Sequence, residues 1–393
     1  MAIAAHIKDS LEASSWIRRM FEAGAALKAR HGADKVFDFS LGNPNLPPPA
    51  GFHQVLSEVA GDSSLDHSYM PNSGYADTRR AVAAQVSAEQ RTDLSENDVI
   101  MTCGAAGGLN VILKALLNPG ETVVVPAPYF VEYGFYAENH GGRLKTAPCR
   151  PDFDLDLPAL AGAITPETRA VIINSPNNPT GAVYPESTLA GLGRLLTEKS
   201  WEYDRTIYLV ADEPYRNITH DGITVPPVFP AYADSLVVTS YSKDLSLPGE
   251  RIGFIAVNPA AEGQEELLAA MTFANRVLGF VNAPALMQRV IAQVQGSRVD
   301  VEAYTRKRDL LCGILETCGY DFVKPAGAFY LFPRSPLPDD VAFVGKLQES
   351  LILAVPGSGF GAPGYFRLSY CVDDATITGA AEGFAAALAA VSR

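Results

Sequence analysis

The feature that most constrains the fold is a series of short apolar runs in the middle of the chain. The runs are rich in β-branched side chains, and each is closed by Gly, Pro, Asn or Asp. They cover residues 99–102, 122–125, 170–173, 207–210, 236–239 and 252–257. Because they do not alternate with polar residues, they are typical of strands buried on both faces of a sheet, and helical stretches at 109–117 and 187–196 lie between several of them. The pattern predicts an α/β fold with a largely parallel sheet.

The pattern changes after about residue 296. A long helix is predicted over residues 301–315, and residues 329–332, 351–355 and 365–370 resemble strands of a smaller α+β unit. A chain of 393 residues is long enough to form two packed domains. We therefore predict a large domain over residues 46–295 and a small domain made of residues 1–45 together with 296–393.

The charge balance excludes partners that are held by bulk attraction to positive charge. The chain has 31 Lys and Arg against 44 Asp and Glu, which gives a net charge of −13. We therefore expect neither nucleic acid nor a membrane as partner, and any anionic ligand needs a local binding arrangement. The 5 cysteines are scattered, so we expect no disulfide framework and no metal site. Because the chain has no signal-peptide core and no apolar run of about 18 residues, we predict a cytoplasmic protein.

Side chains that carry chemistry follow several of the predicted strands. In such sheets, ligands bind beyond the carboxyl ends of the strands. The residues at those ends are Gly104, Ala105, Ala106, Phe130, Asn178, Asp212, Tyr215, Ser240 and Lys243. The small residues 104–108 lead into a helix that we expect to begin near Leu109, so their backbone N–H groups suit a phosphate. A tight strand-to-helix turn is the alternative interpretation of this loop.

Lys243 is the most informative of these residues. It lies just past a buried strand between hydroxyl side chains, and Arg251 follows eight residues later at the start of the next strand. Partial burial and a nearby cation lower the pKa of a lysine toward the neutral amine that condenses with an aldehyde. Asp212 ends another buried strand and is expected to face a cation, because an unpaired buried carboxylate costs several kcal/mol.

Taken in order, these segments resemble the aspartate aminotransferase superfamily, the class I/II aminotransferases of fold type I that use pyridoxal 5′-phosphate. The family pattern is Asn-Pro-x-Gly at a strand end, Asp-x-x-Tyr, Ser-x-x-Lys with Arg eight residues on, and a C-terminal Arg. The chain has each member in that order: Asn178, Asp212 with Tyr215, Ser240 with Lys243 and Arg251, and Arg367. The resemblance extends from about Phe37 to the end, and it implies the fold type I architecture of a pyridoxal-phosphate-dependent transferase.

The resemblance implies a role for each residue around the cofactor ring. Lys243 is expected to form the Schiff base with the cofactor aldehyde and to move the proton of the substrate α-carbon. Asp212 pairs with the pyridine nitrogen and keeps it protonated. Tyr215 and Asn178 donate hydrogen bonds to the ring 3-oxygen, and Phe130 stacks on the ring.

The resemblance also implies how the phosphate is held. The expected ligands are the backbone of Gly104, Ala105 and Ala106, the hydroxyls of Ser240 and Ser242, and Arg251. Tyr69 lies in a segment similar to the family's Tyr-x4-Gly-x3-Leu-Arg, with Thr78 in place of Leu. In the family that tyrosine reaches the phosphate of the neighbouring subunit, so the resemblance implies a homodimer.

The expected substrates are an L-amino acid and a 2-oxo acid such as 2-oxoglutarate, which react in turn by a ping-pong mechanism. Arg367 is expected to bind the substrate α-carboxylate with a bidentate fork, beside Asn178 and the backbone of Gly42. Tyr133 matches the family's second aromatic or histidine, and it is assigned to the substrate site.

The side-chain specificity of the donor stays open at this point. One bacterial subgroup has a lysine in the phosphate loop for a distal carboxylate, but Ala106 stands here. Another subgroup uses an arginine before an Asn-Pro-Pro segment. The best register puts Val277 at that place, and Arg276 is offset by one residue. Aspartate and a neutral or aromatic amino acid therefore both remain candidate donors.

Two other function classes share parts of this pattern. A fold type I lyase, such as a β-C–S lyase or a cyclopropane-forming synthase, has the same Lys, Asp and Arg. A non-catalytic cofactor-binding regulator is disfavoured, because such regulators carry an added DNA-binding domain and this chain begins almost directly with family sequence. The sequence therefore favours an aminotransferase.

Overall fold

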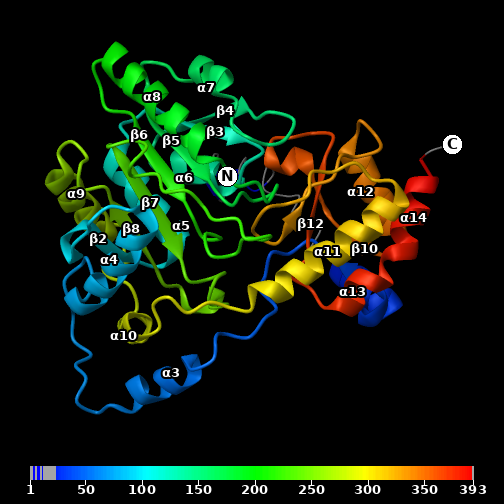
Figure 1. The fold of residues 1–393 in the computed structure, drawn as a ribbon, viewed down its shortest axis with the longest axis horizontal. Helices are drawn as coiled ribbons and strands as arrows, with labels where there is room; N and C mark the ends of the chain where they lie inside the picture. The colour runs from blue at the N-terminus through cyan, green and yellow to red at the C-terminus, as the bar shows by residue number, and fades with distance from the viewer. Residues whose placement is uncertain (1–2, 5–6, 9–10, 12–23, 392–393) are drawn as a thin grey trace.

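The computed structural model describes residues 3–4, 7–8, 11 and 24–391. Its centre is a seven-stranded sheet with the order β2-β8-β7-β6-β5-β3-β4 (Figure 1). The strands are β2 (Val99–Thr102), β3 (Thr122–Ala127), β4 (Arg143–Pro148), β5 (Thr168–Asn174), β6 (Tyr208–Asp212), β7 (Ser235–Ser240) and β8 (Gly253–Val257).

The sheet is largely parallel, as predicted. β4, β3, β5, β6 and β7 run parallel to one another, whereas β8 is antiparallel to both β7 and β2. All six predicted runs are strands. β4 had no counterpart in the prediction, because it forms the edge of the sheet and most of its side chains are partly or fully exposed.

Helices cover both faces of this sheet. One hydrophobic core contains side chains of α5 (Gly104–Leu116), α6 (Glu132–Glu138) and α9 (Gln264–Val277). The other contains side chains of α3, α4, α7, α8 and α10. These helices span Phe52–Gly61, Ala76–Gln90, Leu157–Ala163, Glu186–Glu202 and Ala285–Gln293. In β2, Val99 and Met101 belong to the second core and Ile100 to the first, because successive strand residues point to opposite faces.

A second unit packs beside the sheet and is formed largely by the C-terminal part of the chain (Figure 1). It contains a three-stranded antiparallel sheet, β11-β12-β9, and a parallel pair of β1 with β10. The strands are β1 (Phe37–Asp38), β9 (Tyr330–Leu331), β10 (Ile352–Leu353), β11 (Val355–Pro356) and β12 (Phe366–Ser369). The helices are α11 (Val301–Cys318), α12 (Asp340–Glu349), α13 (Asp374–Gly379) and α14 (Ala381–Ala389).

The N-terminal part joins this second unit, because β1 pairs with β10 and Phe39 is buried in the same core. Most of residues 1–23, which the predicted small domain includes, lie outside the described residues. The proposed limits 1–45, 46–295 and 296–393 stay a prediction, since packing alone does not define which residues move together. In the part of the chain that the structure describes, no helix is long and apolar enough to cross a membrane.

Candidate functional site

A pocket of about 320 Å³ lies at the carboxyl ends of the parallel strands and reaches the second unit. It brings together residues that are far apart in the sequence, as the strand-end argument predicts. Its lining includes the predicted residues Gly42, Ala105, Ala106, Phe130, Asn178, Asp212, Tyr215, Ser240, Ser242, Lys243, Arg251 and Arg367. The structure therefore gathers most of the sequence-predicted residues around one cavity.

Asp212 lies at the end of β6 with its carboxylate buried in the pocket lining. Its Oδ2 accepts a hydrogen bond of 2.6 Å from the hydroxyl of Tyr133, whereas its Oδ1 is buried without a partner among the residues that the structure describes. Burial raises the pKa of Asp212 to about 7, and the hydrogen bond from Tyr133 opposes this shift. An N–H donor or a cation beside Oδ1 would lower the pKa of Asp212 and so restore the ionised carboxylate. The unpartnered Oδ1 therefore marks a position in the pocket for such a group.

Tyr133 has a different place from the one predicted. The sequence assigned it to the substrate site, but its ring is buried in α6 and does not line the pocket. It lies behind Asp212 because its hydroxyl is the donor to that carboxylate. Its ring also packs edge-on against Phe130, with centroids 5.6 Å apart.

Lys243 follows β7 and points its amine toward the N-terminal part of the chain. Its Nζ donates a hydrogen bond of 2.8 Å to the carbonyl oxygen of Gly42. Burial lowers the pKa of Lys243 to about 8, helped by the charges of Arg367 and Arg251 and opposed by Cys371. About a tenth of the amine is therefore neutral and nucleophilic at pH 7, far more than for an ordinary lysine.

The phosphate-binding arrangement predicted from the small-residue loop is the first turn of a helix. α5 begins at Gly104, five residues earlier than expected, so the N–H groups of this turn have no partner within the helix. Arg251 lies across this turn, with Nη1 donating to the carbonyl of Pro248 at 3.0 Å and Nη2 to that of Cys103 at 3.4 Å. A Cβ at Gly104 would lie 2.7 Å from Arg251 Nη2, so a side chain there would displace the guanidinium.

Arg367 enters the pocket from β12 of the second unit. Its Nη1 donates to Asn178 Oδ1 at 3.0 Å and its Nη2 to the carbonyl of Ser40 at 2.7 Å. Its Nε is buried and has no hydrogen-bond partner in the described part of the chain. These contacts orient the guanidinium and leave donor capacity for an anionic group, such as a carboxylate.

Sequence reasoning missed four polar residues in the lining, Ser40, Tyr136, Asn174 and Tyr330. Asn174 ends β5, where its Nδ2 donates to the carbonyl of Asp212 at 2.8 Å and its Oδ1 accepts from the N–H of Asn178 at 2.7 Å. Its position directly at a strand end was a usable signal. Tyr330 lies in β9 of the second unit, and nothing in its local sequence indicated that it reaches this pocket.

Besides Tyr133, the predicted residues Gly104, Tyr69 and Arg276 are also absent from the lining of the pocket. Tyr69 is 90% exposed, and Arg276 is exposed at the end of α9, with its Cζ 5.2 Å from the ring centre of Phe273. Their segments lie side by side, because Asn275 Nδ2 donates to the carbonyl of Asn72 at 2.9 Å. Both side chains are therefore exposed and lie outside the pocket.

The pocket fits pyridoxal phosphate on chemical grounds. The first turn of α5 and Arg251 suit a phosphate dianion, and the partly buried amine of Lys243 suits an aldehyde. The unpartnered Oδ1 of Asp212 suits a protonated ring nitrogen. The three functions lie in one cavity with an aromatic side chain, Phe130, in its wall.

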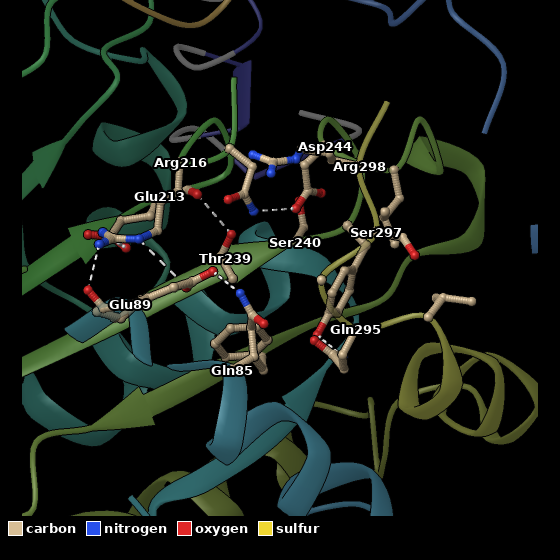
Figure 2. Close-up of a pocket in the computed structure, with 17 residues that line it drawn as sticks. Gln85, Glu89, Glu213, Arg216, Thr239, Ser240, Asp244, Gln295, Ser297 and Arg298 are labelled. Atoms are coloured by element: carbon tan, nitrogen blue, oxygen red, sulfur yellow. Dashed lines mark hydrogen bonds and ion pairs between the residues drawn. The ribbon is translucent and has the colours of Figure 1, made fainter. Parts of the chain in front are cut away.

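A second cavity, of about 130 Å³, is lined by polar side chains, several of which are hydrogen-bonded to one another (Figure 2). Glu213 and Asp244 follow Asp212 and Lys243 directly in the sequence and line this cavity. Arg216 Nη1 donates to Glu213 Oε2 at 2.8 Å, and Asn217 Nδ2 donates to Asp244 Oδ2 at 3.1 Å. The segments that carry the pocket's carboxylate and lysine are therefore tied together here.

Replacing Asp244 by Asn is expected to stabilise the protein more at pH 8 than at pH 5. Burial raises the pKa of Asp244 to about 7 in the folded state. The protonated carboxyl therefore contributes its full stability to the folded protein below about pH 4, the pKa of an unfolded aspartate. This contribution is lost as the pH rises from there through 7. Asn stays neutral and can still accept from Asn217, so the melting temperature of Asp244→Asn should exceed that of the wild type by a few degrees at pH 8.

Thermal unfolding of both proteins at the two pH values measures this difference. Asp93→Asn, at an exposed position, is the matched control and should show no pH-dependent difference from the wild type. An Asp244→Asn effect of the same size at pH 5 and pH 8 would contradict the assignment.

The chain matches the sequence family described as aminotransferase class I and II over residues 34–384. It is 32% identical over 375 residues to the aspartate/prephenate aminotransferase of Thermus thermophilus, with 91% of this chain and 92% of the relative covered. The crystal structure of an amino transferase from Eubacterium rectale has a TM-score of 0.97 and 40% identity, with 100% of both chains covered. The Thermus thermophilus aspartate aminotransferase with maleate has a TM-score of 0.82 and 29% identity, covering 94% of this chain and 96% of that one.

Proposed function

The chain belongs to the class I and II aminotransferase family and is a pyridoxal-phosphate-dependent transaminase, and from this premise we propose that it transfers the amino group of aspartate to a 2-oxo acid such as 2-oxoglutarate. Support for aspartate comes from the relatives, because the Thermus thermophilus protein is named an aspartate/prephenate aminotransferase. The related structure with maleate carries a dicarboxylate, which is the chemical class of aspartate and 2-oxoglutarate.

The observation that carries the proposed chemistry is the unpartnered carboxylate oxygen of Asp212 in the same pocket as Lys243 and Arg367. Pyridoxal phosphate supplies a ring that accepts the electron pair left at the substrate α-carbon. Asp212 holds the proton on the ring nitrogen, so that this nitrogen stays positive. Lys243 Nζ would move the proton from the substrate α-carbon to the aldehyde carbon of the cofactor in the first half-reaction, and from that carbon to the α-carbon of the 2-oxo acid in the second.

The remaining side chains bind and orient. The first turn of α5, Ser240, Ser242 and Arg251 would hold the phosphate of the cofactor. Tyr215 and Asn178 lie in the lining where they can donate to the ring 3-oxygen. Arg367 binds the substrate α-carboxylate, with the backbone of Gly42 beside it.

The distal carboxylate of aspartate needs a cation from outside this pocket. The cations in the lining are Lys243, Arg251 and Arg367, and each already has a role. We propose that Arg276 of a second copy supplies it, together with Tyr69 for the phosphate, in a homodimer. Exposed apolar side chains on the same segments support such an interface, since Tyr69 is 90%, Phe273 56% and Val277 48% exposed. Sedimentation of the purified protein tests the dimer directly.

Replacing Arg276 by Ala should reduce the reaction with aspartate by about 10²-fold while leaving the reaction with alanine within about twofold. The reason is that only aspartate has a second carboxylate to lose a paired cation. The measurement mixes the cofactor-loaded enzyme with each amino acid and follows the loss of the pyridoxal form. Arg289→Ala provides a control at another arginine, and equal losses with both amino acids would remove Arg276 from the distal site.

A neutral or aromatic donor is the second candidate. Leu41, Phe130 and Tyr136 line the pocket and provide apolar surface for an uncharged side chain. The same screen distinguishes the two candidates, because rapid reaction with phenylalanine or alanine and slow reaction with aspartate would favour the second.

We further propose a cytoplasmic location, supported by five cysteines that are all free.

A further inference from the structure

Tyr330 lies between three parts of the proposed active site. It belongs to β9, is 2% exposed and contributes to the pocket lining. Its neighbour Ser369 in β12 is two residues from Arg367, and the Cζ of Arg367 lies 4.6 Å from the centre of the Tyr330 ring. The ring is therefore held against the guanidinium by a cation–π contact.

The hydroxyl of Tyr330 points into the large unit. Its Oη lies 2.9 Å from the Oη of Tyr215. A Cβ at Gly42 would lie 1.9 Å from the same oxygen, so the hydroxyl almost touches the Gly42 backbone. The carbonyl of Gly42 in turn accepts the hydrogen bond from Lys243. The hydroxyl thus has little freedom to turn away from Tyr215.

The direction of the hydrogen bond between Tyr215 and Tyr330 depends on how many hydroxyl protons the two phenols have. Each phenol has one proton to donate, so within the pair one hydroxyl donates and the other accepts. If the Tyr215 hydroxyl donates a hydrogen bond to an anionic oxygen in the pocket, its own oxygen is free to accept a hydrogen bond from the Tyr330 hydroxyl. A chain of two hydrogen bonds in the same direction polarises the second bond and strengthens it.

We propose that Tyr330 is a positioning residue that donates to Tyr215 and so strengthens the hydrogen bond from Tyr215 to the ring 3-oxygen of the cofactor. This inference rests on the proposed placement of pyridoxal phosphate. It assigns to the second unit a role at the cofactor ring, in addition to the binding of the substrate carboxylate by Arg367.

Neither phenol is expected to lose its proton over the range of the test. The charged or titratable groups that face the pair are Arg367, Cys371 and Asp212. Burial raises the pKa of Tyr330 to about 12, although Arg367 opposes the shift, and burial raises the pKa of Tyr215 well above its usual value. A spectral change between pH 5 and pH 9 therefore reports the cofactor and its lysine.

The test is the variant Tyr330→Phe, measured as holoenzyme by absorbance between pH 5 and pH 9. The nitrogen of Lys243 that is linked to the cofactor shares a proton with the ring 3-oxygen. A weaker hydrogen bond to that oxygen makes the nitrogen hold its proton more tightly. The midpoint of the visible absorbance change is therefore expected to rise by about 0.3 to 1 pH unit, the size of a partial loss of one hydrogen bond.

Two controls separate positioning from a general structural effect. Tyr320→Phe removes another buried hydroxyl of the same core, one that donates to the carbonyl of Phe384 at 3.0 Å, and it should leave the midpoint unchanged. In a Tyr215→Phe background, Tyr330→Phe should add no further shift, because its effect passes through Tyr215. Phe at 330 keeps the ring against Arg367, so the affinity for a substrate analogue should stay within about twofold.

An unshifted midpoint in Tyr330→Phe, or the same shift in both backgrounds, would overturn the inference. Failure of the proposed function has a different signature. In that case the wild-type protein itself would bind pyridoxal phosphate without a visible band that depends on Lys243.

Discussion

Replacing Lys243 by Ala is expected to abolish the visible absorbance band of the cofactor-loaded protein and to reduce kcat by at least about 10³-fold. The band requires a covalent link between the amine of Lys243 and the cofactor aldehyde, and Ala has no amine. The rate falls because the same nitrogen acts on the proton of the substrate α-carbon. Borohydride treatment followed by mass measurement of the chain detects the link, and half-reaction rates with amino acids measure the loss of turnover.

Lys324→Ala is the control for Lys243. Lys324 is an exposed lysine that pairs with Asp309 at 2.9 Å on the surface of the second unit. This variant should keep the band and the rate of the wild type. If Lys243→Ala retained a cofactor that borohydride fixes to the chain, another lysine would be the nucleophile and the site assignment would fail.

Replacing Arg367 by Ala is expected to weaken binding of amino and keto acids by about 2 to 5 kcal/mol, which corresponds to about 30- to 5,000-fold. Arg367 is 6% exposed, so a bound carboxylate there is largely removed from water and depends on its partner. Saturation of the half-reaction with substrate measures the affinity. The absorbance band from Lys243 should remain, because Arg367 is assigned to the substrate and not to the cofactor.

Arg367→Lys distinguishes charge from geometry. A lysine keeps the positive charge but cannot reproduce the contacts that the guanidinium makes with Asn178 and with the carbonyl of Ser40. We expect this variant to recover only part of the lost affinity. Unchanged saturation in Arg367→Ala would show that the substrate carboxylate is held elsewhere.

The positive groups of the pocket explain how a chain with a net charge of −13 binds an anionic cofactor and anionic substrates. Lys243, Arg251 and Arg367 line one cavity, and the N-terminus of α5 adds its partial positive charge. The attraction is local, so the acidic exterior does not oppose it strongly at physiological ionic strength.

Sequence patterns were sufficient for the elements that are buried on both faces of the central sheet. Each of the strands β2, β3, β5, β6, β7 and β8 contains an uninterrupted run of at least three buried apolar residues, and such runs have few alternative structures. The edge strand β4 escaped prediction, because its exposed side makes its composition resemble that of a loop. The start of α5 was misplaced, since three of its first five residues are glycines, which have low helix propensity.

The sequence by itself determined which residue types stand at the strand ends, because parallel strands direct their carboxyl ends to the same edge of the sheet. Asp212 and Lys243 could therefore be predicted as site residues from the sequence. Only the tertiary structure decided that Tyr133 is hydrogen-bonded to Asp212 and Tyr330 to Tyr215. It also decided that the side chains of Tyr69 and Arg276 are exposed. These relations depend on contacts between side chains separated by about 80 to 200 residues, or on exposure in the folded chain. Local periodicity contains no information about such distances, because they result from how whole elements pack against one another.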